Sequence, residues 1–297
     1  MLSFEKLEPE HLELLKHYLG HVTYETCDYT PVGIMMWRDY FYIHIAEKDD
    51  TLYFLSRYGN IGQCFSFPVR KDGKTPTYEA VENISLYAKE NNLPLRFCTV
   101  PESQLPILVE YMGDSCNVIT DKAWYDYIYL AEDLASLRGR KYNGQRNHIN
   151  RFQKQYKDYS FIPIEASNID MVKEFSETFC DRGADKIDMK EYESRAVVEV
   201  FDYFLSSDLV GGFIEHEGRI LAIAVGEKIG DTMYQHIEKA LPSINGAYQT
   251  VAREFAITFA SECMFINREE DEGIEGLRRA KEALHPIKLQ KKYLVYK

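Results

Sequence analysis

The chain has 297 residues, of which 45% are hydrophobic and 28% are charged, and its formal net charge is −12. This length predicts about two domains with hydrophobic cores, and the composition excludes a disordered or collagen-like protein. The negative charge argues against indiscriminate nucleic-acid binding but leaves room for a local basic site, because a phosphate responds to the local potential.

The first half of the chain alternates between helix and strand patterns. Leu12, Leu15 and Leu19 form one apolar stripe of an amphipathic helix, and alternating aromatic residues after Trp124 are typical of a strand. The predicted helices are Glu8–Tyr18, Tyr78–Glu90 and Ser103–Met112. The predicted strands are Phe41–Ala46, Leu52–Ser56, Gln63–Pro68, Leu95–Val100 and Trp124–Leu130.

The second half repeats nearly the same order of elements, which favours an internal duplication of the fold. The predicted helices are Ile169–Cys180, Glu191–Leu205, Ile244–Ser261 and Gly276–Leu284. The predicted strands are Ser160–Ile164, Leu209–Glu215, Ile220–Lys228, Thr232–Ile237, Met264–Ile266 and Lys288–Val295. We therefore expect an α+β protein with mixed sheets, with an N-terminal domain at 1–137, a basic linker helix at 138–157 and a C-terminal domain at 158–297.

The predicted linker differs from the rest of this acidic chain because it contains no acid. Its cations are Arg138, Arg140, Lys141, Arg146, Arg151, Lys154 and Lys157. Ile149, Phe152 and Tyr156 recur at helical spacing, which predicts a helix with one buried stripe and a basic remainder. Two interpretations stay open. The helix start could bind an anion or phosphate, with Asn147 as a neutral hydrogen-bonding group, or the cations could form a solvated face on an acidic neighbour.

Several classes of protein are excluded by missing patterns. There is no GxSxG, HExxH or GxGxxG motif, and Gly73-Lys74-Thr75 lacks the first glycine of a phosphate loop. His17 and His21 stand four residues apart without a third ligand at metal-binding spacing, so we predict no metal site. No apolar run approaches the ~18 residues of a membrane helix, and the start has no signal-peptide pattern. The six scattered cysteines are typical of reduced thiols, so we expect a cytoplasmic protein.

A candidate acid–base pair lies at the end of a predicted strand. His236 and Glu238 are two residues apart, so their side chains are expected on one face. A histidine and a carboxylate placed there could transfer protons, although a core-edge histidine beside a surface glutamate is the alternative.

Two further segments near the C-terminus could bind an anion. The turn around Gly246 enters a helix, as in sites that present backbone amides to phosphate, although glycine is common in any turn. Lys281 lies three residues after Arg278 at the border of an apolar stripe, where a lysine either extends into solvent or directs its charge into a cleft.

Several short motifs together match one protein family. They are Gly139–Tyr142 with Arg146–Phe152, His236–Ala240, Gly246–Gln249, Asn267–Glu269 with Gly273–Lys281, and Pro286. Cys27-Asp28-Tyr29 and Met36-Trp37-Arg38 match the family's N-terminal signature. On these residues the sequence resembles the phosphatidylglycerol lysyltransferase C-terminal domain family over nearly the whole chain.

The resemblance implies two tandem GNAT-like (N-acyltransferase-like) domains joined by a helix, with the site in the second domain. It implies transfer of an aminoacyl group from aminoacyl-tRNA to an amine or hydroxyl, such as a phospholipid head group or a peptide. The implied catalytic residues are Lys281, His236 and Glu238. The implied donor- or phosphate-binding residues are Arg140, Lys141, Arg146, Asn147, Gly246, Tyr248, Gln249, Asn267, Arg268 and Arg278.

Two other functions stay open. The GNAT-like architecture also suits an acyl-CoA-dependent N-acyltransferase that acts on a small amine or peptide. The acetyl-CoA pattern Gln/Arg-x-x-Gly-x-Gly/Ala is not matched, however, because its first and last positions hold Ser243 and Tyr248, and a tyrosine would crowd the pyrophosphate. The third function is a non-catalytic binding module, because a fold does not by itself imply chemistry.

Overall fold

The computed structural model describes residues 1–59, 61–113, 116–180 and 188–297. The chain forms two compact units, which are Met1–Asp126 with Gln290–Lys297, and Tyr127–Leu289. Each unit contains a mixed sheet with helices, so the predicted α+β class is confirmed. The domain boundaries placed at residues 137 and 157 stay a prediction.

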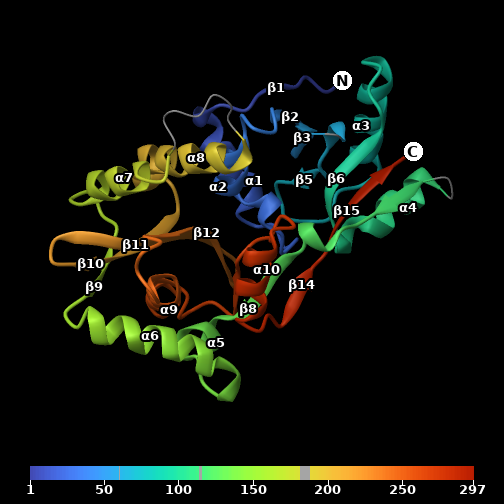
Figure 1. Ribbon diagram of the computed structural model, residues 1–297. Helices are drawn as coiled ribbons and strands as arrows, with labels where there is room; N and C mark the ends of the chain where they lie inside the picture. The colour runs from blue at the N-terminus through green and yellow to red at the C-terminus, as the bar shows by residue number, and fades with distance from the viewer. Residues whose placement is uncertain (60, 114–115, 181–187) are drawn as a thin grey trace. The chain divides into compact units, whose positions relative to one another are not determined.

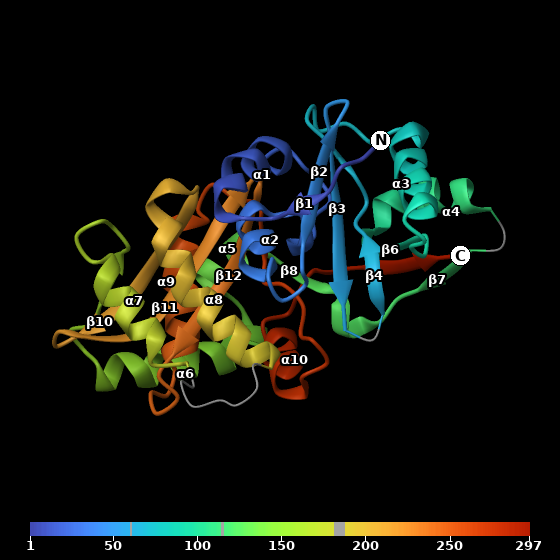
Figure 2. The same cartoon turned by 90° about the horizontal axis from the view of Figure 1, so that it is seen from above.

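The first unit has a sheet in the order β1-β2-β3-β4-β6-β15-β7, with β5 paired to β3. Its strands are β1 (Glu5–Lys6), β2 (His44–Lys48), β3 (Thr51–Tyr58), β4 (Gly62–Phe65), β5 (Val69–Arg70), β6 (Arg96–Pro101), β7 (Asn117–Ile119) and β15 (Lys292–Tyr296). Its helices are α1 (Leu12–Leu19), α2 (Pro31–Trp37), α3 (Tyr78–Glu90) and α4 (Leu105–Met112). Helices α1 and α2 lie together on one side of the strands, and α3 and α4 lie together on the other (Figure 2).

The second unit has a sheet in the order β14-β8-β13-β12-β11-β10-β9. Its strands are β8 (Asp126–Leu130), β9 (Ser160–Pro163), β10 (Leu209–His216), β11 (Arg219–Ile229), β12 (Thr232–Ala240), β13 (Phe265–Asn267) and β14 (Lys288–Gln290). Its helices are α5 (Ala131–Ser136), α6 (Asn143–Gln155), α7 (Ile169–Glu177), α8 (Met189–Tyr203), α9 (Ala247–Phe259) and α10 (Glu275–Glu282). Helices α7 and α8 cover one face of β10–β12, whereas α9, backed by α5 and α6, covers the other (Figure 1).

The two sheets share one topology, which agrees with the predicted duplication. Three antiparallel strands (β2–β4 or β10–β12) are followed by a helix and then by a strand parallel to the third. An antiparallel strand from a distant part of the chain completes each sheet. This strand is β15 from the chain end in the first unit and β8 from before the helical segment in the second.

Most predicted elements are confirmed, and α3 has the predicted bounds. Two local predictions are wrong, and one helix was missed. The 138–157 segment is not one helix, because Gly139 has a left-handed backbone (φ 91°) and a short 3₁₀ turn, Arg140–Tyr142, precedes α6. The strand expected at Lys288–Val295 is divided into β14 and β15. Helix α2 was not predicted, although Thr30 caps it by accepting the Gly33 amide at 3.2 Å.

A buried ion cluster fixes the chain end within the first unit. The Nζ of Lys292 on β15 lies 2.6 Å from Asp28 Oδ2, 2.7 Å from Asp126 Oδ1 and 3.3 Å from Cys27 Sγ. The other Asp126 oxygen accepts the Cys27 amide at 2.7 Å. The Cys27-Asp28 motif therefore contributes to a charged contact that joins the start of the chain to its last strand.

Replacing Lys292 by Met should destabilise the protein by about 3–5 kcal/mol, because two aspartates then lose their buried cation. The matched control is the neighbouring Lys291→Met, which removes a surface pair with Glu102 and should cost about 0–1 kcal/mol. Urea denaturation of both variants measures the difference. Equal stability of the two variants would contradict a structural role for the cluster.

Candidate functional site

The parallel strands β12 and β13 separate at their carboxyl ends. Their pairing covers Thr232–Tyr234 and Phe265–Asn267, and β12 then continues to Ala240 after β13 has ended. Ligands of α/β sheets commonly bind outside the carboxyl ends of parallel strands. The end of β12 and the loop after β13 therefore form the candidate site.

A β-bulge in β12 lies at His236. Gly226 of β11 pairs with Gln235 and Val225 pairs with Ile237, so His236 is an extra residue in the ladder. Bulges re-aim side chains and are frequent beside active sites. The bulge also interrupts the alternation from which we predicted that His236 and Glu238 share a face.

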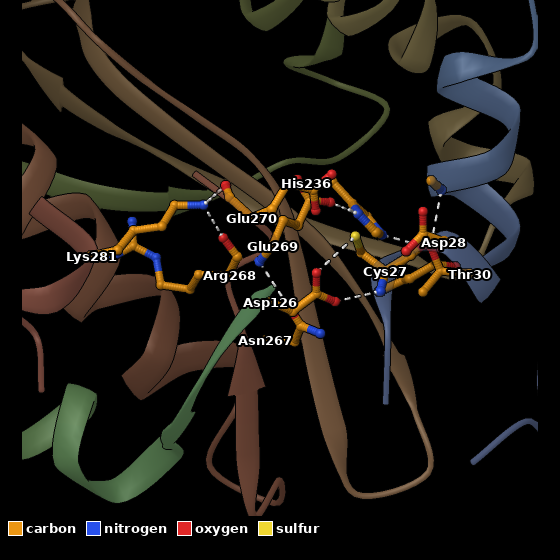
Figure 3. A network of polar contacts seen from close by, with 12 residues as sticks. Cys27, Asp28, Thr30, Asp126, His236, Asn267, Arg268, Glu269, Glu270 and Lys281 are labelled. Carbon is orange, nitrogen blue, oxygen red and sulfur yellow. Dashed lines mark hydrogen bonds and ion pairs between the residues drawn. The ribbon is translucent and has the colours of Figure 1, made fainter. Parts of the chain in front are cut away.

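The imidazole of His236 lies between two carboxylates (Figure 3). Its Nε2 is 2.8 Å from Glu227 Oε1, and its Nδ1 is 2.7 Å from Glu269 Oε1. Burial disfavours the imidazolium, but the hydrogen bonds to both carboxylates outweigh this effect and raise the pKa of His236 to about 10. His236 is therefore an imidazolium at neutral pH, with both nitrogens occupied.

Glu238 has different partners from His236. It accepts hydrogen bonds from Arg268 Nη2 at 2.6 Å and from Gln235 Nε2 at 2.5 Å. The structure thus pairs Glu238 with the predicted donor-binding residue Arg268. Neither side chain is highly exposed, so this ion pair is only partly screened by water.

Lys281 points into the protein from α10. Its Nζ donates to the backbone carbonyls of Arg268 and Glu270 and lies 5.8 Å from the centre of the Tyr127 ring (Figure 3). The side chain is buried, which rules out extension into solvent, the first of the two alternatives that the sequence left open. Its ammonium holds the loop that follows β13.

Arg278, predicted to bind the donor, is paired within the same unit. It makes two hydrogen bonds to the buried Asp271, at 2.7 and 2.9 Å, and the Tyr127 hydroxyl donates to the same carboxylate at 2.6 Å. Burial alone would raise the pKa of Asp271, but these bonds lower it to about 2. Asn267 is also buried, and its Oδ1 accepts the Glu269 amide at 2.7 Å.

Arg138 of the predicted linker lies 4.0 Å from Glu132, and the other six cations divide into two groups. Lys141 pairs with Asp133 at 3.0 Å, and Arg146 donates to the carbonyls of Leu137 and Gly139 at the start of α6. A second group is exposed and has no ion-pair partner among the described residues. It comprises Arg151 and Lys154 on α6, Arg140 in the preceding 3₁₀ turn and Lys157 just after the helix, which together we call the exposed α6 cations, and Asn147 on α6 is also exposed.

Gly246 allows α9 to begin close to α6. Its backbone is left-handed (φ 83°), and a Cβ at this position would lie 2.4 Å from the carbonyl oxygen of His148. The missing side chain therefore makes room for the α6 backbone and not for a phosphate. Tyr248 is exposed and Gln249 is partly exposed in the first turn of α9.

Sequence reasoning missed Glu227, Glu269 and Asp271. Glu227 carried a usable signal, because it is a carboxylate within the otherwise apolar run of β11 and a buried charge requires a partner. Glu269 entered the sequence analysis only as the last residue of the Asn267–Glu269 motif, and nothing local indicated the partners of Glu269 or of Asp271.

The described residues thus form two α+β units, each with a mixed sheet that contains a parallel strand pair, and a charged cluster lies beside the parallel pair of the second unit. The family model described as "Phosphatidylglycerol lysyltransferase, C-terminal" matches residues 23–296, so the chain belongs to this family. No curated protein matches the sequence. None of the described helices has the length and hydropathy to cross a membrane.

Solved structures match over the whole chain. A conserved protein of unknown function from Bacteroides thetaiotaomicron has 29% identity and a TM-score of 0.90, with 100% of this chain and 99% of that chain covered. L-PGS from Bacillus licheniformis has 13% identity and a TM-score of 0.65, with 99% and 93% covered. FemX has 10% identity and a TM-score of 0.57, with 99% and 97% covered. The last two matches show the fold.

Replacing Gly246 by Ala should destabilise the protein by about 1–3 kcal/mol, because the new methyl group collides with the α6 backbone. Gly276→Ala in α10 is the matched control. A Cβ there meets open space, so it should stabilise by about 0.5–1 kcal/mol. Thermal unfolding distinguishes the two, and a neutral Gly246→Ala would contradict the close approach.

His236→Gln should lower stability in a pH-dependent way. The pKa of His236 is raised from 6.5 to about 10, so its contribution is complete below pH 6.5 and is lost as pH rises through 10. The difference in unfolding free energy between wild type and variant should therefore shrink over this range. A constant difference, or a neutral imidazole by NMR at neutral pH, would contradict the charged assignment.

Proposed function

We propose that this protein is an aminoacyltransferase, which moves an aminoacyl group from aminoacyl-tRNA to an amine or hydroxyl acceptor. The acceptor would be a phospholipid head group or a peptide-like molecule. The family, with L-PGS and FemX as structural relatives, supports aminoacyl transfer as the class of reaction. The choice of aminoacyl-tRNA as the donor is more specific than this class of reaction and needs its own observation.

The observation that carries the donor assignment is the group of exposed α6 cations. Arg151, Lys154 and Lys157 lie within seven residues, and the chain around them is acidic, with a net charge of −12. Cations that are paired internally add little to phosphate binding, whereas exposed cations release counterions when they neutralise phosphates. A polyphosphate such as tRNA fits a row of separate charges.

The Gly246 turn favours this donor over acyl-CoA. A phosphate-binding turn needs its glycine to open toward the ligand, whereas here the glycine faces the α6 backbone. Tyr248 stands two residues later, where the sequence pattern for acetyl-CoA requires a small residue. We therefore propose aminoacyl-tRNA as the donor, and the experiment below includes acetyl-CoA as the alternative donor.

The chemistry would be direct acyl transfer. An aminoacyl ester is already activated, so positioning of the acceptor and stabilisation of the oxyanion supply much of the rate. Among the predicted catalytic residues, Lys281 would hold the loop after β13, and Glu238 would position the Arg268 guanidinium beside the reacting groups. His236 would supply a fixed positive charge and position its two carboxylates.

The function is tested by incubating the protein with labelled aminoacyl-tRNA and extracts of total lipid and peptide. Labelled product would support the proposal. Labelled acetyl-CoA is added in a parallel reaction, and acylation there without any product from aminoacyl-tRNA would replace the proposed donor. An absence of turnover with either donor favours the binding-module alternative.

The triple variant Arg151→Ala, Lys154→Ala, Lys157→Ala should bind tRNA more weakly. The slope of the logarithm of the binding constant against the logarithm of the salt concentration should decrease in magnitude by roughly one for each phosphate that the variant no longer neutralises. Filter binding over a salt series measures both effects. The matched control replaces Lys71, Lys74 and Lys89 of the first unit by Ala and gives the same change in net charge. Equal affinities for the two triple variants would show that the exposed α6 cations form a solvated face.

A further inference from the structure

The Glu227–His236–Glu269 contacts restrict which group can accept a proton. His236 is the conventional candidate, but both of its ring nitrogens bond to carboxylates, at 2.8 and 2.7 Å. Its imidazolium form is favoured at neutral pH, so it has no lone pair for an incoming proton. The proton acceptor must then be sought among its neighbours.

The two carboxylates on His236 differ in access. The Glu227 side chain is 3% exposed and lies within strand β11, whereas the Glu269 side chain is 27% exposed. Glu269 follows β13 at its carboxyl end, where this strand separates from β12. Of the pair, Glu269 is the carboxylate that a molecule at the strand ends can reach.

The backbone of Glu269 is held in a costly conformation. Its φ is 59°, in the left-handed region that a glutamate adopts at a cost of about 1–2 kcal/mol. Its amide donates to Asn267 Oδ1 at 2.7 Å, and its carbonyl accepts from the Tyr127 amide at 3.1 Å. Lys281 binds the carbonyls on either side of it. Such strain persists where the surroundings enforce it, and it is concentrated at functional sites.

We propose that Glu269 is the catalytic base of the transfer reaction, with His236 and Glu227 as positioning residues. This inference rests on the proposed function. The acceptor's amine or hydroxyl attacks the ester carbonyl carbon, a new C–N or C–O bond forms, and the acceptor's proton passes to the Glu269 carboxylate. The ester bond to the tRNA ribose then breaks, and the ribose oxygen takes that proton, so Glu269 is regenerated.

The test compares single-turnover transfer from labelled aminoacyl-tRNA by wild type and by Glu269→Gln. The expected result is a loss of about 10²- to 10⁴-fold in rate, the usual range for a general base. Affinity for aminoacyl-tRNA should stay unchanged. The matched control is Glu275→Gln on α10, whose side chain is 77% exposed and pairs with Arg279, and it should react at the wild-type rate.

A second variant separates chemistry from folding. Glu269→Ala should be inactive and should regain activity when formate is added, because a small carboxylate can occupy the vacated space and accept the proton. A merely structural role would give no such rescue. Full activity of Glu269→Gln, or an inactive Glu269→Ala without rescue by formate, would overturn the role of Glu269 and leave the proposed function standing.

The proposed function can be tested separately from the role of Glu269. If wild type reacts with acetyl-CoA and not with aminoacyl-tRNA, the proposed donor is wrong, and the same variants measured with acetyl-CoA decide the role of Glu269. If wild type transfers from neither donor, both proposals are overturned.

Discussion

The arrangement of polar groups in the second unit depends on one buried cation, the His236 imidazolium. Its two hydrogen bonds join strand β11, strand β12 and the loop after β13, which are three separate segments of the chain. The Glu227 carboxylate is 3% exposed and would be costly at this depth without a positive partner, because burying an unpaired charge is unfavourable. Glu227 pairs with Tyr234 in the register of β11 and β12, so regular alternation places His236 on the same face of the sheet as Glu227, and the bulge after His236 changes the alternation toward Glu238.

The loop after β13 is fixed by a second set of charges. Lys281 binds two of its carbonyls, and Asp271 binds Arg278, the Tyr127 hydroxyl and the Gly273 amide. These groups bind one another and the backbone of the loop, so their main physical effect is to make the loop rigid where the parallel strands separate. Rigid support of this kind is what a pre-organised site requires, because mobile charges lose much of their effect on a transition state.

Helix α6 has two functions in the structure. The helix packs on α9 so closely that a Cβ at position 246 would collide with its backbone, while the exposed α6 cations lie on the helix and directly beyond its two ends. Because Gly246 faces the α6 backbone, the turn before α9 is not open to the phosphate of a small donor. The exposed cations are spread along the helix, and this spread suits a long polyanion better than a single pyrophosphate.

The fold class and most of the helices and strands could be predicted from the sequence. The periodicity of apolar residues is a local signal, so helices such as α3 could be placed from it, and the acid-free segment from 138 to 157 was visible as composition alone. The importance of His236 and Lys281 was also indicated by their motifs. Their partners were not, because Glu227 and Glu269 lie 9 and 33 residues from His236, and such pairings depend on strand register.

Which charged side chains are paired within the protein and which are exposed could be learned only from the folded structure. Arg146 and Arg278 are indistinguishable in sequence from Arg151, yet the first two bind internal carbonyls or carboxylates and the third is exposed. One inserted residue in β12 reversed the expected relation between His236 and Glu238. The physical reason is that composition specifies which charges a protein has, whereas the free energy of burying a charge depends on the neighbours that the fold brings to it.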